Sequence, residues 1–157
     1  IKAFNKLGLP LKIIGRGPEM KRLQKIAKSN IEFLGRVPDE ELAKYYSECQ
    51  AFIFPQEEDF GIVAIEALAS GRPVIAFQGG DIPEHMEEGK MGLFFKKQSS
   101  DDIIEAVEKF KKMDFDKKYI RSKILRFDKE IFKDKIREYI ERELADFKES
   151  EKLTSRN

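Results

Sequence analysis

Two glutamates, Glu58 and Glu66, stand with seven residues between them in the segment PQEEDFGIVAIE, residues 55–66. A carboxylate accepts hydrogen bonds from hydroxyl groups. A helix that begins at Gly61 would direct unpaired N–H groups and the positive end of its dipole toward an anion. Gly61 would also let a ligand approach the backbone closely. The segment therefore has the residue types needed to hold a ligand that carries both hydroxyl groups and phosphate.

Glu66 is the unusual residue of this segment because its neighbours in the predicted helix are alanine, valine, isoleucine and leucine. It follows Ile62 by one helical turn, so we expect both side chains on one face. A carboxylate buried among apolar residues costs several kcal/mol unless it is paired. A hydroxyl-rich ligand would pair it, and Arg72 is the alternative partner. For Glu58 and Asp59, the simpler alternative is that they cap the helix.

The elements that must position these residues alternate between short apolar runs and helical patterns. The runs predict strands at 11–15, 31–35, 51–55, 73–77 and 92–95. The helical patterns predict a helix at 18–28, one that begins at Asp39 and one at 61–70. After the last strand, only helices are predicted. This alternation is typical of parallel βαβ units and predicts an α/β fold, a Rossmann-like doubly wound parallel sheet. Ligands of such sheets bind at the carboxyl ends of the strands, where residues 56–61 lie.

Both ends of the chain are predicted to be helical. Ile1, Phe4 and Leu7 have helical spacing, with Gly8 at the C-cap position. Because a doubly wound fold starts with a strand, we expect a first strand upstream that is absent from this chain. Near the other end, one helical stripe, which we expect to pack on this sheet or on a partner domain, consists of Phe132, Ile136, Tyr139, Ile140, Leu144 and Phe147. We therefore predict a domain at 1–147 and a polar tail at 148–157.

Composition excludes several classes of function. The 157 residues fit one domain, and 30 Lys and Arg nearly balance 29 Asp and Glu, so there is no electrostatic footprint for nucleic acid. One cysteine, Cys49, and one histidine, His85, make neither a disulfide framework nor a metal site. No apolar run reaches the roughly 18 to 20 residues that span a bilayer. These features predict a soluble, cytoplasmic domain.

Four segments together resemble a known family. EDFGIVAIE resembles the Glu-x7-Glu motif of the group 1 (family 4) retaining glycosyltransferases, which have two Rossmann domains (the GT-B architecture). The segments LKIIGRGPE, IEFLGRVPDEEL and ALASGRPVIA resemble other motifs of that family, in the family's order and spacing. The resemblance covers nearly the whole chain and implies the C-terminal, donor-binding half of such an enzyme.

The resemblance also implies roles for individual residues. Glu58 would be the catalytic residue and would hydrogen-bond hydroxyls of the transferred sugar, while Glu66 would accept from the ribose hydroxyls. Backbone N–H groups of Gly61, Ile62 and Val63 would hold the diphosphate, and Phe60 would also contact the donor. Gly15, Arg16 and Gly17 would lie beside the nucleotide. Gly35, Arg36 and Val37 would flank the base, with Asp39 near a guanine edge. No metal or cofactor is implied, because the nucleotide sugar is a substrate.

Three departures from the family pattern matter. Asp59 stands where the family usually has glycine, and this form resembles O-antigen mannosyltransferases, so we expect GDP-mannose as the donor. GGDIPE is one residue longer than the family's Gly-Gly-x-x-Glu turn, which leaves the match of Glu84 open. The family's Arg and Lys that grip the diphosphate, and its acceptor domain, have no match here. We therefore expect the isolated chain to bind a nucleotide sugar weakly and to transfer nothing.

The predicted function is donor binding within an enzyme that moves a hexose, mannose in particular, to a saccharide or lipid-linked acceptor. Its expected partners are the nucleotide sugar and the N-terminal acceptor domain of the same enzyme, with peripheral association of the full enzyme at the inner face of the membrane left open. Three alternatives remain: a nucleotide-binding module, which would not need both glutamates; a sugar-nucleotide epimerase, with His85 as the candidate acid or base; and a glycosidase with Glu58 and Glu66 as acid and nucleophile.

Overall fold

The computed structural model describes the backbone of residues 1–154 and the side chains of residues 1–148. The chain divides into two compact units, residues 1–122 and residues 123–157. The first unit alternates strands with helices, as predicted, in the order α1 (Lys2–Leu7), β1 (Leu11–Ile14), α2 (Met20–Ile26), β2 (Ile31–Gly35), α3 (Asp39–Glu48), β3 (Phe52–Phe54), α4 (Ile62–Ala69), β4 (Val74–Phe77), α5 (Ile82–His85), β5 (Gly92–Phe95) and α6 (Ser100–Phe110). Helix α7 (Lys117–Ile124) follows, then a 3-10 turn (Leu125–Phe127) and α8 (Lys129–Thr154).

All strand pairs are parallel, which confirms the predicted α/β class. Strand β1 pairs with β2, and β3, β4 and β5 form a second ladder in that order. In the described part of the chain the strands thus form two ladders, whereas the sequence predicts a single sheet. Within the second ladder Ile53 lies opposite Ile75, and Ile75 opposite Leu93.

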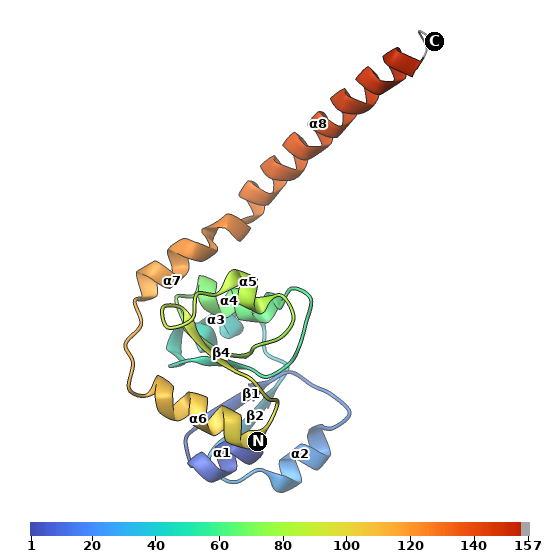
Figure 1. Ribbon diagram of the computed structural model, residues 1–157. Coiled ribbons are helices and arrows are strands. Elements are labelled where there is room, and N and C mark those ends of the chain that lie inside the picture. Colours follow the sequence, from blue (N-terminus) through green and yellow to red (C-terminus); the bar gives the residue numbers. More distant parts are fainter. Residues whose placement is uncertain (155–157) are drawn as a thin grey trace. The chain divides into compact units, whose positions relative to one another are not determined.

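Helices cover both faces of the strands, as in a doubly wound fold. Figure 1 shows α1, α2 and α6 on one side of the strands and α3, α4 and α5 on the other. The α1 and α6 side is filled by a hydrophobic cluster in which Phe4 and Val107 pack with Ile31 of the first ladder and Ile75 of the second. This shared cluster joins the two ladders.

Local chemistry explains where the elements end. Helix α1 ends at Gly8, which has a left-handed conformation with φ of 71° and donates its N–H to the carbonyl of Phe4. Helix α2 is shorter than predicted because Ala27 is already extended. Helix α6 begins at Ser99, whose side chain accepts a hydrogen bond of 3.1 Å from the N–H of Asp102.

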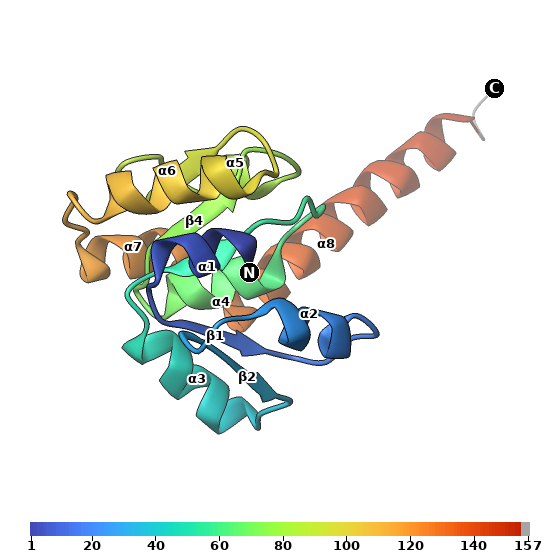
Figure 2. The ribbon, with the colours of Figure 1, turned by 90° about the horizontal axis from the view of Figure 1, so that it is seen from below.

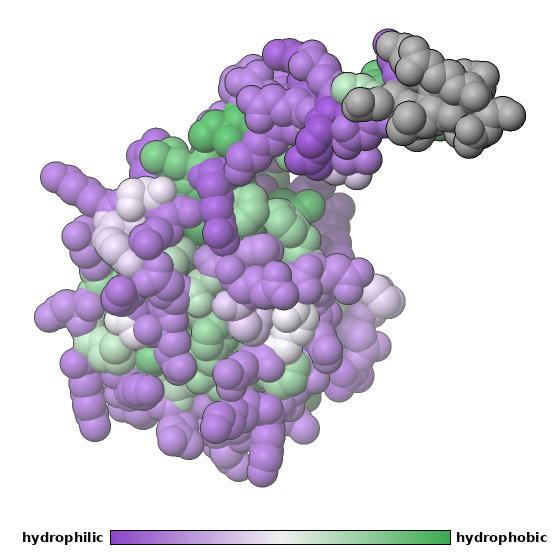
Figure 3. All heavy atoms as spheres, turned by 45° about the horizontal axis from the view of Figure 1, so that its top comes forward, coloured by the Kyte–Doolittle hydropathy of each residue, from purple (hydrophilic) through white to green (hydrophobic). Residues whose placement is uncertain are grey.

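The surface is largely hydrophilic. Figure 3 shows purple, hydrophilic residues over most of the visible face, with green, hydrophobic residues between them. Among residues 1–154 no helix has the length and apolarity needed to cross a bilayer.

The second unit is mostly helix α8, and the boundary predicted at residues 147 and 148 falls inside it. Its predicted stripe is helical, and the side chains that form the stripe are 44% to 61% exposed: Phe132, Ile136, Tyr139, Ile140, Leu144 and Phe147.

Candidate functional site

The acidic loop, residues 55–61, leaves the carboxyl end of β3 and leads into α4. Residues 56–63 line an open depression of about 500 Å³. The Glu58 side chain is exposed there, and its Oε1 accepts a hydrogen bond of 2.6 Å from Nε2 of Gln56. The loop therefore presents Glu58 at the carboxyl edge of the strands, as the sequence predicts for a ligand-binding loop.

Helix α4 begins without a side-chain cap. Its N-cap residue is Gly61, and among the described side chains none caps the first turn with a hydrogen bond. The alternative in which Glu58 or Asp59 caps the helix is therefore wrong. The N–H groups of Ile62 and Val63 and the positive end of the helix dipole are left to face the depression, which both residues line.

The conformation and the packing of Gly61 both require a glycine. It is buried, and its φ of 73° is a left-handed conformation that other residues seldom adopt. A Cβ built at Gly61 would lie 2.6 Å from Cδ1 of Ile82 and 3.1 Å from Cζ of Phe54. Conformation and packing therefore require a glycine at this position, and the close approach of a ligand to its backbone stays a prediction.

Glu66 is exposed, and the expectation that it is buried is wrong. Helix α4 buries Ala64, Ile65, Ala67 and Leu68 against the strands. Glu66 shares the opposite, exposed face with Ile62 and Val63, which are 64% and 36% exposed. The shared face of Ile62 and Glu66 is confirmed. The carboxylate therefore lies on the same face as the uncapped first turn, where it needs no buried cation.

Tyr46 is a site residue that the sequence did not single out. Its hydroxyl donates a hydrogen bond of 3.1 Å to Oε2 of Glu66. Burial raises the pKa of Tyr46, and the neighbouring carboxylate of Glu66 raises it further, so the hydroxyl remains a protonated donor at neutral pH. The available signal was the inward stripe of Leu42, Tyr45, Tyr46 and Cys49, in which a buried tyrosine needs a partner for its hydroxyl.

Arg72 does not pair with Glu66. No ion pair or hydrogen bond joins the two residues in the described part of the chain, and the Nε of Arg72 is buried without a hydrogen-bond partner there. The charge of Arg72 acts instead on Cys49, whose pKa it lowers against a larger increase from burial. This removes the alternative explanation for Glu66.

The glycine turn at residues 79–80 packs against the main chain of the acidic loop. The N–H of Asp81 donates a hydrogen bond of 3.2 Å to the carbonyl of Glu58. A Cβ built at Gly80, where φ is 63°, would lie 2.1 Å from that same carbonyl oxygen. The turn and the loop are therefore in backbone contact, which fixes the position of Glu58 relative to α5.

The predicted nucleoside residues follow the strands of the first ladder. The N–H of Gly15 donates a hydrogen bond of 2.7 Å to the carbonyl of Gly35, so the turns after β1 and β2 contact each other. Arg16, Gly17 and Arg36 are exposed, Val37 is half-buried, and Asp39 is the exposed first residue of α3. Figures 1 and 2 both show the loops after β1 and β3 on the same side of the first unit.

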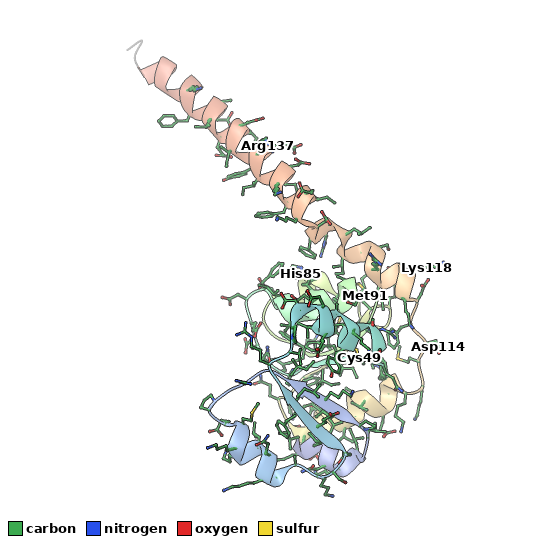
Figure 4. The ribbon with its side chains drawn as sticks, turned by 180° about the vertical axis from the view of Figure 1, so that it is seen from behind. Cys49, His85, Met91, Asp114, Lys118 and Arg137 are labelled. Carbon is green, nitrogen blue, oxygen red and sulfur yellow. The ribbon has the colours of Figure 1, made fainter. Side chains whose placement is uncertain are left out.

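His85 lies at the margin of the acidic loop. Its ring packs 5.2 Å from the ring of Phe60, which is 41% exposed. Cys49 follows α3 and His85 ends α5, on different elements (Figure 4). Among the described side chains, those of residues 1–148, no group of three or more His, Cys, Asp or Glu residues is arranged to hold a metal ion. The polar groups described at the acidic loop and the start of α4 are carboxylates, the Tyr46 hydroxyl and backbone N–H groups.

Comparison with known families identifies the chain. The family described as "Glycosyl transferases group 1" matches residues 1–112. The chain belongs to this group 1 glycosyltransferase family. The match includes both ladders, the acidic loop and α4, and so all the site residues described above.

Relatives of this glycosyltransferase chain are longer proteins. It is 33% identical over 112 residues to an uncharacterized glycosyltransferase of Methanocaldococcus jannaschii, covering 68% of this chain and 32% of that protein. It is 34% identical over 113 residues to the GDP-mannose-dependent alpha-(1-6)-phosphatidylinositol monomannoside mannosyltransferase of Mycobacterium tuberculosis, covering 64% of this chain and 29% of that protein. The chain thus spans about a third of the length of these relatives.

A solved structure supports the fold of this glycosyltransferase chain. The Anabaena protein HepE, in complex with UDP and glucose, superimposes with a TM-score of 0.70 at 20% identity, over 84% of this chain and 40% of that one. The shared fold confirms the Rossmann-like, GT-B type arrangement that the sequence predicts.

Proposed function

We propose that residues 1–147 form the donor-binding half of a retaining GT-B glycosyltransferase. The complete enzyme would transfer a hexose, namely mannose from GDP-mannose, to a saccharide or lipid-linked acceptor. It would work in the cytoplasm, with peripheral association at the inner face of the membrane, and would need an N-terminal acceptor domain. The observation that carries the proposal is the uncapped start of α4 with the exposed carboxylates of Glu58 and Glu66 before and after it.

The diphosphate is assigned to the start of α4. The N–H groups of Gly61, Ile62 and Val63 lie where a helix dipole favours negative charge. When the bond between the anomeric carbon and the diphosphate oxygen breaks, charge grows on the leaving diphosphate, and donors that are already oriented stabilise it. Because Phe60 and Ile62 are exposed at this edge, at 41% and 64%, a bound donor would also cover apolar surface.

Glu58 is assigned to the transferred sugar. Its Oε1 accepts from Gln56, which holds the side chain at the edge of the depression and leaves the other oxygen for a sugar hydroxyl. A carboxylate there orients the sugar and lies near the positive charge that develops on its ring. Glu58 would thus contribute both to binding and to the rate.

The nucleoside is assigned to the residues around α3. Glu66 would accept from the ribose hydroxyls, and Asp39 would read the guanine edge. Asp39 and Tyr46, the partner of Glu66, are seven residues apart and share one face of α3, about 10 Å apart along its axis. The turns at Gly15–Gly17 and Gly35–Val37 would lie beside the nucleotide.

GDP-mannose and UDP-glucose are the two candidate donors. The Mycobacterium tuberculosis relative is GDP-mannose-dependent by name, which supports GDP-mannose. The HepE structure contains UDP and glucose, which makes UDP-glucose the second candidate. Asp39 favours the first, because a carboxylate accepts the two N–H donors of a guanine edge, whereas uracil offers one.

The test is a calorimetric titration of the 157-residue chain with GDP-mannose, UDP-glucose and GDP. We expect weak binding with GDP-mannose ahead of UDP-glucose. Glu66→Gln should weaken GDP several-fold, and Glu58→Gln should leave GDP unchanged but weaken GDP-mannose. Glu57→Gln is the matched control, since Glu57 lines the same depression without an assigned contact.

Three outcomes would contradict the proposal. The ribose role fails if Glu66→Gln binds GDP as tightly as the unmodified chain, and the sugar role fails if Glu58→Gln and Glu57→Gln behave alike. The need for a separate acceptor domain fails if the 157-residue chain alone transfers the sugar to an acceptor.

A further inference from the structure

Tyr46 and Glu66 come from different helices, α3 and α4, and meet through a single hydrogen bond of 3.1 Å. The bond engages Oε2 of Glu66, and no other hydrogen bond or ion pair of this side chain occurs in the described part of the chain. One carboxylate oxygen is therefore engaged from within the protein, and Oε1 remains available to a ligand. The hydrogen bond restricts Glu66, because an exposed glutamate without such a bond would sample several rotamers.

The tyrosine is held in place by packing. Tyr46 is 8% exposed, and its ring contacts the ring of Phe52 edge-to-face, with centroids 5.6 Å apart and planes at 70°. Phe52 belongs to β3, the strand that leads into the acidic loop. The hydroxyl is thus fixed relative to the strand that also positions Glu58.

The charge state suits a permanent donor. Burial and the carboxylate of Glu66 both raise the pKa of Tyr46, so its hydroxyl keeps its proton over the whole physiological range. The Tyr46 hydroxyl therefore stays a donor to Oε2 of Glu66, and the other carboxylate oxygen can accept a hydrogen bond from a hydroxyl group of a ligand.

We propose that Tyr46 is a positioning residue that orients Glu66, so that its free oxygen accepts a ribose hydroxyl and the site prefers ribonucleotides to deoxyribonucleotides. This inference rests on the proposed function, since it assigns the ribose to Glu66. It adds a second residue of α3, after Asp39, to the proposed donor site. Tyr46 acts through Glu66 and need not touch the ligand.

The test is a cycle of two ligands and three chains. GDP and 2′,3′-dideoxy-GDP are titrated against the unmodified chain, Tyr46→Phe and Glu66→Gln. Tyr46→Phe keeps the buried ring and its contact with Phe52 but removes the donor. We expect it to weaken GDP about three- to tenfold, the worth of one hydrogen bond, and to leave dideoxy-GDP unchanged.

Tyr45→Phe is the matched control. Tyr45 is the neighbouring tyrosine on α3, and Nζ of Lys12 lies over its ring, 4.9 Å from the ring centroid. This variant should bind both ligands as the unmodified chain does. Thermal denaturation of each variant shows whether the fold is retained.

The outcomes separate this inference from the function on which it rests. If Glu66→Gln loses the preference for GDP while Tyr46→Phe keeps it, the positioning role of Tyr46 is overturned and the ribose role of Glu66 stands. If Tyr46→Phe weakens GDP and dideoxy-GDP equally, Tyr46 has a merely structural role. If Glu66→Gln itself keeps the full preference for GDP, the ribose assignment and the positioning role both fail.

Discussion

Gly80 and Glu58 are in backbone contact: a Cβ at Gly80 would lie 2.1 Å from the carbonyl oxygen of Glu58 and 3.0 Å from its nitrogen. These atoms belong to the main chain of the acidic loop, so they cannot move aside as the end of a flexible side chain can. The glycine turn after β4 therefore determines where the catalytic candidate Glu58 lies, although the two residues are far apart in sequence.

Gly80→Ala should displace the acidic loop. The substitution adds the clash with Glu58 to the cost of a left-handed alanine, which is about 1–2 kcal/mol. We expect a lower melting temperature and weaker binding of GDP-mannose, measured by calorimetry. Gly89→Ala is the matched control, because Gly89 has φ of 79° but nothing within 4 Å of its Cβ position. Equal effects of the two substitutions on binding would contradict the positional role of Gly80.

Gly61→Ala should destabilise the chain partly through Ile82. The new Cβ would meet Cδ1 of Ile82 at 2.6 Å, and Ile82→Val removes that atom. We expect Gly61→Ala to cost about 0.5–1 kcal/mol less in the Ile82→Val background than alone, a coupling typical of residues in contact. Urea denaturation of the four chains of the cycle measures it. Strict additivity would show that the strain of the positive φ, not the contact, makes Gly61 a glycine.

Asp59→Asn should strengthen the binding of a nucleoside diphosphate. Asp59 lines the depression at the start of α4 and caps no N–H group, so its negative charge opposes a phosphate there. Removing one exposed charge near a helix start should be worth about 0.3–1 kcal/mol, or roughly two- to fivefold in affinity at low salt. The gain should shrink as salt is added, because exposed charges are screened. Weaker binding of GDP-mannose by the variant would indicate instead that Asp59 contacts the sugar.

Cys49 should be slow to react. Burial raises the pKa of its thiol despite the opposing charge of Arg72, so little thiolate forms at neutral pH. We expect iodoacetamide to alkylate Cys49 several-fold faster in urea than in the folded chain. Fast alkylation without denaturant would contradict the protection of the half-buried Cys49 thiol.

The same thiol should make stability depend on pH in the alkaline range. The folded pKa lies above the ordinary value of 9.0, so this contribution to stability is present below that pH and is lost as pH rises through the folded pKa. The free energy of unfolding should therefore fall as pH rises above 9.0, and the free energy of unfolding of Cys49→Ala should fall less over the same range. Parallel curves for the two chains would exclude a contribution from Cys49.

The strands and the acidic loop were predictable because short apolar runs between helical patterns have few other interpretations. The burial of Glu66 was predicted wrongly, since Ile62 and Val63 suggested a helix that is apolar all round, whereas both residues are exposed beside it. The bond between Tyr46 and Glu66 could not be predicted, because it joins residues 20 positions apart through the packing of α3 against α4. Local patterns determine the elements, and tertiary packing determines the partners.

Because the strands form two ladders, a bound donor would also affect the stability of the domain. The turns that follow β1 and β2 belong to one ladder, and the acidic loop follows β3 of the other. No ladder hydrogen bonds join the two ladders in the described chain. The shared hydrophobic cluster packs them together instead. A nucleotide sugar that contacts both groups of turns would link the two ladders. Because it would bind only the folded domain, it would raise the free energy of unfolding. The bound substrate would then hold the two ladders together, in addition to being the molecule on which the enzyme acts.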